Sequence, residues 1–142
     1  MEIAILALGC FWGPEIKFDK LEGVTKTEVG YCGGNSETTT YEKVCSGNTN
    51  HAEVVKIEFD PKKISYEKIL EFFFNFHDPT TLNAQGPDIG TQYRSEIFYL
   101  NDDQKIIAEK IIKENNKKLT GKIVTKLSLH KNYCKAEDYH QK

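Results

Sequence analysis

The order of apolar and polar residues along the chain predicts five strands and three helices. A short, continuous apolar run over residues 3–8 is typical of a buried strand. Over residues 52–59 apolar and polar side chains alternate instead, which predicts a strand with one buried and one solvated face. The remaining strands are expected where β-forming residues gather, over residues 24–31, 93–100 and 123–129.

Three segments between these strands repeat their apolar residues at helical spacing. The first begins at about Trp12 and ends before the second strand. The second follows Ser65, a good N-cap residue, and runs to about Phe76. The third opens at Asn101 with the pattern of a capping box and ends near Gly121.

This order of elements predicts an α+β fold, with helices covering one mixed sheet in a two-layer, ferredoxin-like arrangement. Residues 77–92 have no periodicity, and an unstructured connection of that length within a compact domain is usually functional. The 142 residues contain no internal repeat, low-complexity tract or linker, so one domain is expected over residues 1–142.

Composition and charge narrow the class of protein. Hydrophobic residues make up 39% of the chain and charged residues 28%, as in soluble globular proteins. The net charge of -2, with both signs interspersed, offers no field for nucleic acid or an anionic membrane. No secretory signal pattern, membrane-spanning run or glycine-rich phosphate loop is found. We therefore expect a cytoplasmic monomer without a cofactor.

Four cysteines stand at positions 10, 32, 45 and 134. No two of them form a C-x-x-C pair, which argues against a zinc ribbon or a thioredoxin-type motif, and no metal is expected. Cys10 stands where the first strand meets the first helix, and a helix N-terminus favours a thiolate over a thiol. Position alone leaves open whether Cys10 is reactive or a packed core thiol.

Glu53 is the second unusual residue. It has the same strand parity as Val55 and Ile57, so its carboxyl group is expected on the apolar side of the sheet. Burial disfavours the charged form and raises the pKa of a carboxyl group, which then can donate a proton near neutral pH. A buried ion pair with a lysine or arginine is the alternative.

Eight short blocks, spread over essentially the whole chain, together resemble one enzyme family. The blocks are GCFWGPE at 9–15, GYCGG at 30–34, TY at 40–41 with VCSG at 44–47, HAEVV at 51–55, HDPTT at 77–81, QG at 85–86 with Asp88, GTQYRS at 90–95 and AEDYHQ at 136–141. In this order they resemble the motifs of the peptide methionine sulfoxide reductase A family, which acts on the S epimer of the sulfoxide.

The resemblance implies a role for each matching residue. Cys10 is the nucleophile that attacks the sulfoxide sulfur and becomes a sulfenic acid as methionine leaves. Glu53 protonates the sulfoxide oxygen, and Tyr41 and Tyr93 hydrogen-bond to it. Asp88 orders the site through water.

Phe11 and Trp12 match the wall that receives the methyl group of the substrate. Purely structural roles stay open at this point: core packing for Trp12, half-buried sheet aromatics for Tyr41 and Tyr93, and a turn for Asp88.

The resemblance also implies how the enzyme is regenerated. Many members of the family resolve the sulfenic acid with a cysteine near the C-terminus, which forms a disulfide that thioredoxin reduces. Cys134 is the cysteine nearest that end here and is favoured as the resolving residue. Cys32, beside two glycines on an expected mobile loop, is the second candidate, and Cys45 is expected to be buried and inert. If none resolves the intermediate, an external thiol would attack Cys10 directly.

The expected activity is therefore a thiol-dependent oxidoreductase that returns methionine S-sulfoxide, in proteins or free, to methionine and repairs oxidative damage. Two alternatives remain. A cysteine hydrolase or acyl transferase would use His51 or His77 to activate Cys10. A metal-binding or redox-sensing module would use Cys32, Cys45 and His51, although their spacing matches no common zinc pattern.

Overall fold

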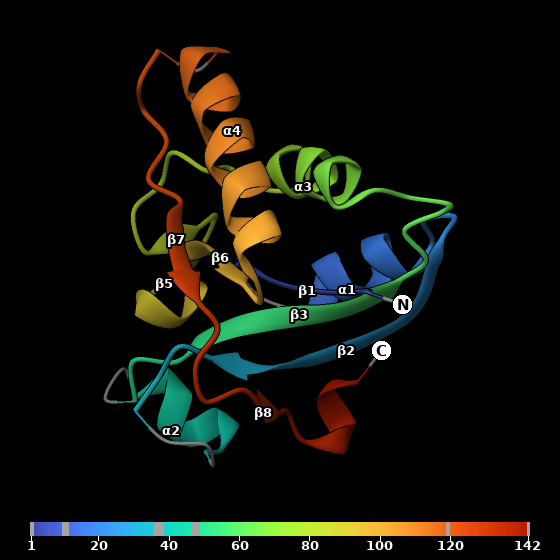
Figure 1. The fold of residues 1–142 in the computed structure, drawn as a ribbon. Coiled ribbons are helices and arrows are strands. Elements are labelled where there is room, and N and C mark those ends of the chain that lie inside the picture. Colours follow the sequence, from blue (N-terminus) through green and yellow to red (C-terminus); the bar gives the residue numbers. More distant parts are fainter. Residues whose placement is uncertain (1, 10–11, 36–38, 47–48, 119, 142) are drawn as a thin grey trace.

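The computed structural model describes residues 2–9, 12–35, 39–46, 49–118 and 120–141. These residues form an α+β fold built on a six-stranded sheet with the strand order β7-β6-β1-β3-β2-β8 (Figure 1). Neighbouring strands are antiparallel except for β6 and β7, which are parallel. The strands are β1 (Glu2–Leu8), β2 (Val24–Cys32), β3 (Ala52–Phe59), β6 (Ser95–Tyr99), β7 (Lys126–Leu129) and β8 (Cys134–Lys135).

The three predicted helices are present as α1, α3 and α4, and they contribute side chains to one core against the same face of the sheet. Ser65 caps α3 as predicted, since its side chain accepts a hydrogen bond from the N–H of Lys68. The helices are α1 (Trp12–Asp19), α2 (Tyr41–Cys45), α3 (Tyr66–Asn75) and α4 (Asp102–Lys118), with 3-10 helices η1 (Thr91–Tyr93) and η2 (Asp138–His140).

The ferredoxin-like arrangement is confirmed in the centre of the sheet. There the order β6-β1-β3-β2 places the first strand between the third and the last strand of a β-α-β-β-α-β unit. The sequence missed the additions to this unit: α2, the strand pair β4 (Ala84–Gln85) and β5 (Asp88–Ile89), η1, β8 and η2. Each is too short to carry a hydrophobic period.

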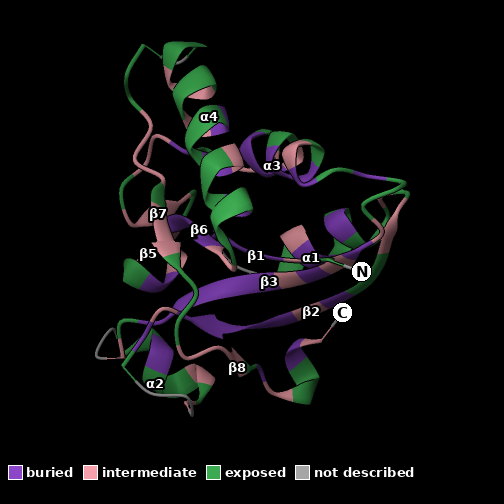
Figure 2. Ribbon diagram, viewed as in Figure 1, coloured by how far each residue is buried: buried purple, intermediate pink, exposed green. Residues whose placement is uncertain are grey.

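Burial explains why β1 is continuously apolar. The helices cover one of its faces, where Leu6 packs with the main core, and a smaller cluster that includes Ala7 and Phe98 covers the other. Figure 2 shows this central part of the sheet as buried and the outer helix surfaces as exposed.

The chain after β7 crosses from one edge of the sheet to the other, because β7 and β8 are the two edge strands (Figure 1). The carbonyl of Lys131 accepts a hydrogen bond from the N–H of Gly33 at 2.8 Å, and the side chain of Asn132 donates to the carbonyl of Gly34 at 2.9 Å. The polar tail, for which no element was predicted, is thus fixed to β2 and brings residues 136–141 to the site described below.

His77 follows α3 and is enclosed by hydrogen bonds. Its Nδ1–H donates to the carbonyl of Phe73 at 2.6 Å, and its Nε2 accepts from the hydroxyl of Ser95 at 2.7 Å. Desolvation lowers the pKa of His77 from the usual value of 6.5 to about 4. The neutral ring therefore joins α3 to β6.

This arrangement predicts acid-sensitive stability. The unfolded chain takes up a proton below about pH 6.5, whereas folded His77 takes it up only near pH 4, so stability is lost as the pH falls through that window. The full loss is about 3 kcal/mol. Urea unfolding of wild type and His77→Gln at pH 7.5, 5.5 and 4.5 should show a smaller decline in the variant. Identical declines would contradict the assignment.

Candidate active site

Glu53 lies on the helix-covered side of β3 and is only 1% exposed, as its parity predicted. It stands directly opposite Tyr31 of β2. Burial disfavours the carboxylate and favours the neutral acid. The site is therefore built around a carboxyl group that the sheet holds away from water.

Two phenols from separate segments lie beside this acid. Tyr41 opens α2, whose N-cap Thr40 accepts a hydrogen bond from the N–H of Lys43, and Tyr93 ends η1. Burial raises the pKa of Tyr41, hydrogen bonds to Cys45 and Tyr93 raise it further, and the charge that Glu53 carries when it is deprotonated acts in the same direction. Both phenols of the pair stay protonated and can donate hydrogen bonds.

Tyr93 also connects this cluster to the predicted Asp88. Burial raises the pKa of Tyr93, and the charges that Glu53 and Asp88 carry when deprotonated add to the effect. Asp88 is partly exposed at the start of β5. The structure thus brings together four of the residues that the sequence singled out: Glu53, Tyr41, Tyr93 and Asp88.

Cys10 and Phe11 lie outside the described residues. Their neighbours on either side are described: Gly9 follows β1 in a backbone conformation with φ of 98°, and Trp12 opens α1. A side chain on Gly9 would collide with Gln85, since a Cβ there would lie 2.7 Å from its Cγ. Position 9, the last described residue before Cys10, thus requires glycine.

Trp12 is not a core residue, because 52% of its surface is exposed. Its indole N–H donates to Nδ1 of His140 at 3.1 Å. The His140 ring is buried and lies 4.5 Å from the ring of Tyr41 and 5.6 Å from that of Trp12, measured between centroids. His140 therefore joins Trp12 to the phenol pair.

Sequence reasoning gave His140 only a structural role. The available signal was its place in the AEDYHQ block, but nothing local indicated that η2 would fold back beside α1 and α2. Replacing His140 with alanine is expected to release the indole and to raise the KM for the sulfoxide that the sequence resemblance implies as substrate several-fold, with a smaller effect on kcat. Steady-state kinetics on His140→Ala and His140→Asn test this expectation. A fall in kcat alone would contradict it.

Glu137 fixes the position of α2. Its carboxylate accepts hydrogen bonds from the hydroxyl of Tyr31 at 2.9 Å and from the backbone N–H of Tyr41 at 3.0 Å. Although burial acts in the opposite direction, these bonds hold the pKa of Glu137 below its usual value. The tail thus contributes both an aromatic ring and an anchor to the site.

The three described cysteines differ in access. Cys32 ends β2, is fully buried and donates to the carbonyl of Lys131 at 3.3 Å, so the prediction of a mobile loop is wrong. Burial also raises the pKa of its thiol. Cys45 is exposed, contrary to prediction, and contacts Tyr41. Cys134 is partly buried in β8.

The alternative chemistries find little support in the described residues. His77 uses both ring nitrogens for structural hydrogen bonds, and Nδ1 of His51 accepts from the N–H of Gly34 at 3.2 Å. Among the described residues, no group of three His, Cys, Asp or Glu side chains could hold a metal ion.

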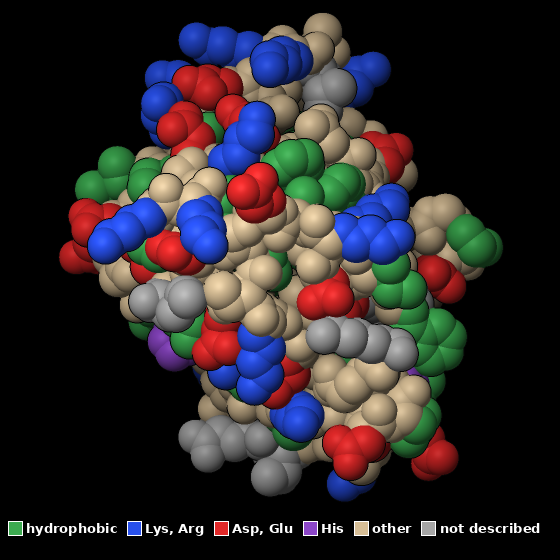
Figure 3. Space-filling model, turned by 90° about the vertical axis from the view of Figure 1, so that its right-hand side faces the viewer, with side chains coloured by type: hydrophobic (Ala, Val, Ile, Leu, Met, Phe, Trp, Pro, Cys, Tyr) green, Lys and Arg blue, Asp and Glu red, His purple; other side chains and the backbone are tan. Residues whose placement is uncertain are grey.

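The described part of the chain contains no helix long and apolar enough to span a membrane. Acidic and basic side chains are mixed on the face shown in Figure 3.

Comparisons with known proteins agree with the sequence blocks. The family model described as peptide methionine sulfoxide reductase matches residues 2–142. Peptide methionine sulfoxide reductase MsrA of Pelagibacter ubique is 75% identical over 142 residues, which are 100% of this chain and 97% of that protein.

Two solved structures of Mxr1 from Saccharomyces cerevisiae share the fold. The reduced form superposes with a TM-score of 0.92 at 42% identity, over 99% of this chain and 82% of that one. Mxr1 in complex with Trx2 gives a TM-score of 0.69 at 31% identity, over 93% of this chain and 78% of that one. The chain therefore belongs to the peptide methionine sulfoxide reductase A family.

Proposed function

We propose that the protein reduces the S epimer of methionine sulfoxide, free or within proteins, to methionine at the expense of thiols. The observation that carries this proposal is the buried Glu53 beside the hydrogen-bonded phenols Tyr41 and Tyr93, in a chain of this family. A cytoplasmic, monomeric enzyme with one catalytic domain over residues 1–142 is the form we expect.

The first step transfers the oxygen atom from the substrate to the enzyme. The sulfur of Cys10 attacks the sulfoxide sulfur, and Glu53 donates a proton to the sulfoxide oxygen, which is a poor leaving group until it is protonated. Hydrogen bonds from Tyr41 and Tyr93 stabilise that oxygen as charge develops. The hydroxyl group then passes from the substrate sulfur to the Cys10 sulfur as the bond between the two sulfur atoms breaks, so that methionine leaves and Cys10 is left as a sulfenic acid.

The other residues that match the family motifs are expected to bind the substrate or to order the site. Phe11 and Trp12 would receive the methyl group of the substrate, and the exposed indole of Trp12 suits a site open to a methionine side chain on another protein. Asp88, beside Tyr93, would order the site through water. Neither role requires a metal or an organic cofactor.

Stereochemistry gives the simplest test of this function. The purified protein should reduce methionine S-sulfoxide in the presence of dithiothreitol and leave the R epimer unchanged, as followed by chromatography of the released methionine. Equal reduction of both epimers, or of neither, would contradict the proposal.

The second step removes the sulfenic acid, and Cys134 remains the favoured resolving residue. In register, Cys134 stands opposite Tyr31, which in turn stands opposite Glu53. Residues directly opposite one another point to the same face of a sheet, so Cys134 lies on the Glu53 side. Attack of its thiol on the sulfenic acid of Cys10 would form a disulfide and release water.

A thiol count distinguishes the candidates. After one equivalent of S-sulfoxide without reductant, wild type should lose two thiols and Cys134→Ser should lose one, as measured by thiol titration after denaturation. Cys45→Ser serves as the matched variant and should still lose two. Two thiols lost from Cys134→Ser would assign the role to another cysteine, and one lost from wild type would indicate direct attack by an external thiol.

The disulfide would then be reduced by a thioredoxin-type dithiol. Mxr1, a structural relative, has been crystallised in complex with Trx2, which supports a reductant of this kind. Exchange of two thiols of the donor for the enzyme disulfide returns Cys10 and the resolving cysteine to their reduced forms.

A further inference from the structure

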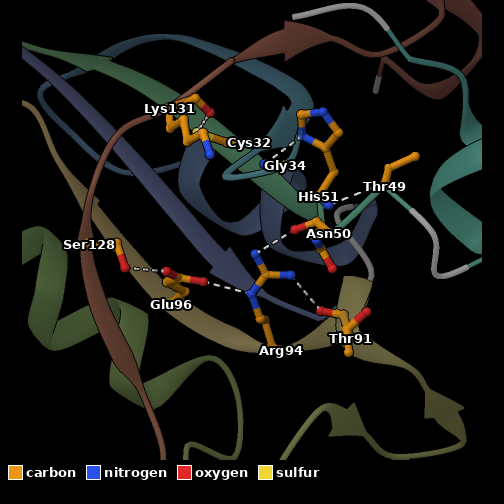
Figure 4. A network of polar contacts seen from close by, with 10 residues as sticks. All are labelled: Cys32, Gly34, Thr49, Asn50, His51, Thr91, Arg94, Glu96, Ser128 and Lys131. Carbon is orange, nitrogen blue, oxygen red and sulfur yellow. Dashed lines mark hydrogen bonds and ion pairs between the residues drawn. The ribbon is translucent and has the colours of Figure 1, made fainter. Parts of the chain in front are cut away.

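Arg94 connects the two segments that present the acid and one of the phenols (Figure 4). Its Nη2–H donates to the backbone carbonyl of Asn50 at 2.9 Å, and its Nη1–H donates to that of Thr91 at 2.9 Å. Asn50 lies three residues before Glu53, and Thr91 is the first residue of the 3-10 helix that ends at Tyr93. One guanidinium group thus holds both backbones.

A buried acid fixes the orientation of this guanidinium. The Nε–H of Arg94 donates to Glu96 at 2.6 Å, and the second carboxylate oxygen of Glu96 accepts from the hydroxyl of Ser128 at 2.6 Å (Figure 4). Glu96 is buried in β6, and Ser128 belongs to β7. The planar fork of arginine can make all three contacts at once, whereas an ammonium group cannot reproduce their geometry.

Both held segments have irregular backbones. Asn50 has a positive φ of 61°, and Gly90, which precedes η1, has a φ of 148°. Asn50 and Gly90 lie outside the strands and helices, just before the elements that carry Glu53 and Tyr93. Side-chain contacts such as those of Arg94 therefore help to set the position of one segment relative to the other.

We infer that Arg94 is a positioning residue for sulfoxide reduction, setting the distance between the carboxyl group of Glu53 and the hydroxyl of Tyr93. This inference rests on the proposed function, because both groups must meet the same sulfoxide oxygen. The role of the guanidinium is indirect, because it holds backbone carbonyls of the two segments. It acts through the two carbonyls, with Glu96 and Ser128 as its attachment to the sheet.

The structure also offers a route for chemical rescue. An open hollow of about 320 Å³ lies beside the network, and Asn50, Thr91, Arg94, Glu96 and Ser128 are among its lining residues. Removing the Arg94 side chain would enlarge this hollow and leave three hydrogen-bond acceptors at its wall. Free guanidinium can enter from solvent and occupy the vacated place.

The test compares Arg94→Ala and Arg94→Lys with wild type, using methionine S-sulfoxide and dithiothreitol. We expect kcat to fall about 100-fold in Arg94→Ala with little change in KM, since a displacement of about 1 Å is enough for such a loss. Arg94→Lys keeps the charge, but its kcat should lie closer to that of Arg94→Ala than to that of wild type on a logarithmic scale. Millimolar guanidinium chloride should raise kcat of Arg94→Ala at least tenfold, whereas sodium chloride should not.

A matched control separates positioning from stability. Tyr133→Phe removes a side-chain hydrogen bond to Glu28 on β2 and should leave kcat unchanged with or without guanidinium. A loss in Arg94→Ala that merely follows the unfolded fraction, with no rescue, would overturn the inference. Full activity in Arg94→Lys would overturn it as well.

Hydrogen exchange keeps the inference separate from the proposed function. If wild type does not reduce the sulfoxide, the function is wrong, but Arg94→Ala should still show faster amide exchange at residues 50–53 and 91–94 than wild type at equal global stability. Unchanged exchange in both segments would overturn the positioning role, whatever the activity.

Discussion

Replacing Cys10 with serine is expected to abolish reduction of methionine S-sulfoxide, with kcat lower by about 10⁴-fold or more. The reason is chemical: the reaction ends with the oxygen atom on the enzyme sulfur as a sulfenic acid, and a serine hydroxyl cannot take that place. Methionine release should be absent even in a single turnover with excess enzyme.

The fold of this variant should be intact, which circular dichroism and thermal unfolding can establish. Titration of the denatured variant should give three thiols instead of four. Cys32→Ser is an unsuitable control because Cys32 is fully buried, whereas Cys134→Ser should still release one methionine per enzyme. Retention of more than a tenth of wild-type kcat by Cys10→Ser would contradict its role as nucleophile.

The second large effect is expected at Glu53. Glu53→Gln keeps the size and polarity of the side chain but removes the proton, so kcat should fall about 10²- to 10⁴-fold with KM little changed. Burial favours the neutral acid at Glu53, and the amide of glutamine is also neutral. The free energy of unfolding should therefore change little. Steady-state kinetics and urea unfolding of the same preparation measure both quantities.

The direction in which kcat changes with pH tests whether Glu53 acts as a general acid. A general acid works only while it is protonated, so kcat of wild type should decline as the pH rises above the pKa of Glu53, and this decline should be absent in Glu53→Gln. Glu58→Gln, five residues further along the same strand and partly exposed, is the matched control and should keep the wild-type profile. A wild-type profile in Glu53→Gln would rule out Glu53 as the acid.

The fold was largely predictable because its main elements carry long periodic patterns. The alternation in β3 gave that strand its bounds, and it also placed Glu53 on the covered face. The cap at Ser65 gave the start of α3. These features are local, so a single sequence contains them in full.

The parts that were missed depend on contacts between distant residues. Nothing near Cys134 indicates that β8 would pair with Tyr31, more than 100 positions earlier. The exposure of Cys45 follows from the short helix α2, whose position depends on Glu137. Likewise, the sequence does not indicate that the side chain of Arg94 binds Glu96 and, at the same time, the backbone of Asn50, which lies 44 positions earlier.

The most direct test of the account is a single turnover without reductant on a variant in which Cys45 and Cys134 are both replaced by serine. The account predicts one methionine per enzyme from the S epimer and a trapped sulfenic acid, which dimedone labels on the peptide that contains Cys10. Mass spectrometry identifies the labelled peptide. Methionine formed without a label at Cys10, a label at Cys32 instead, or no methionine at all would contradict it.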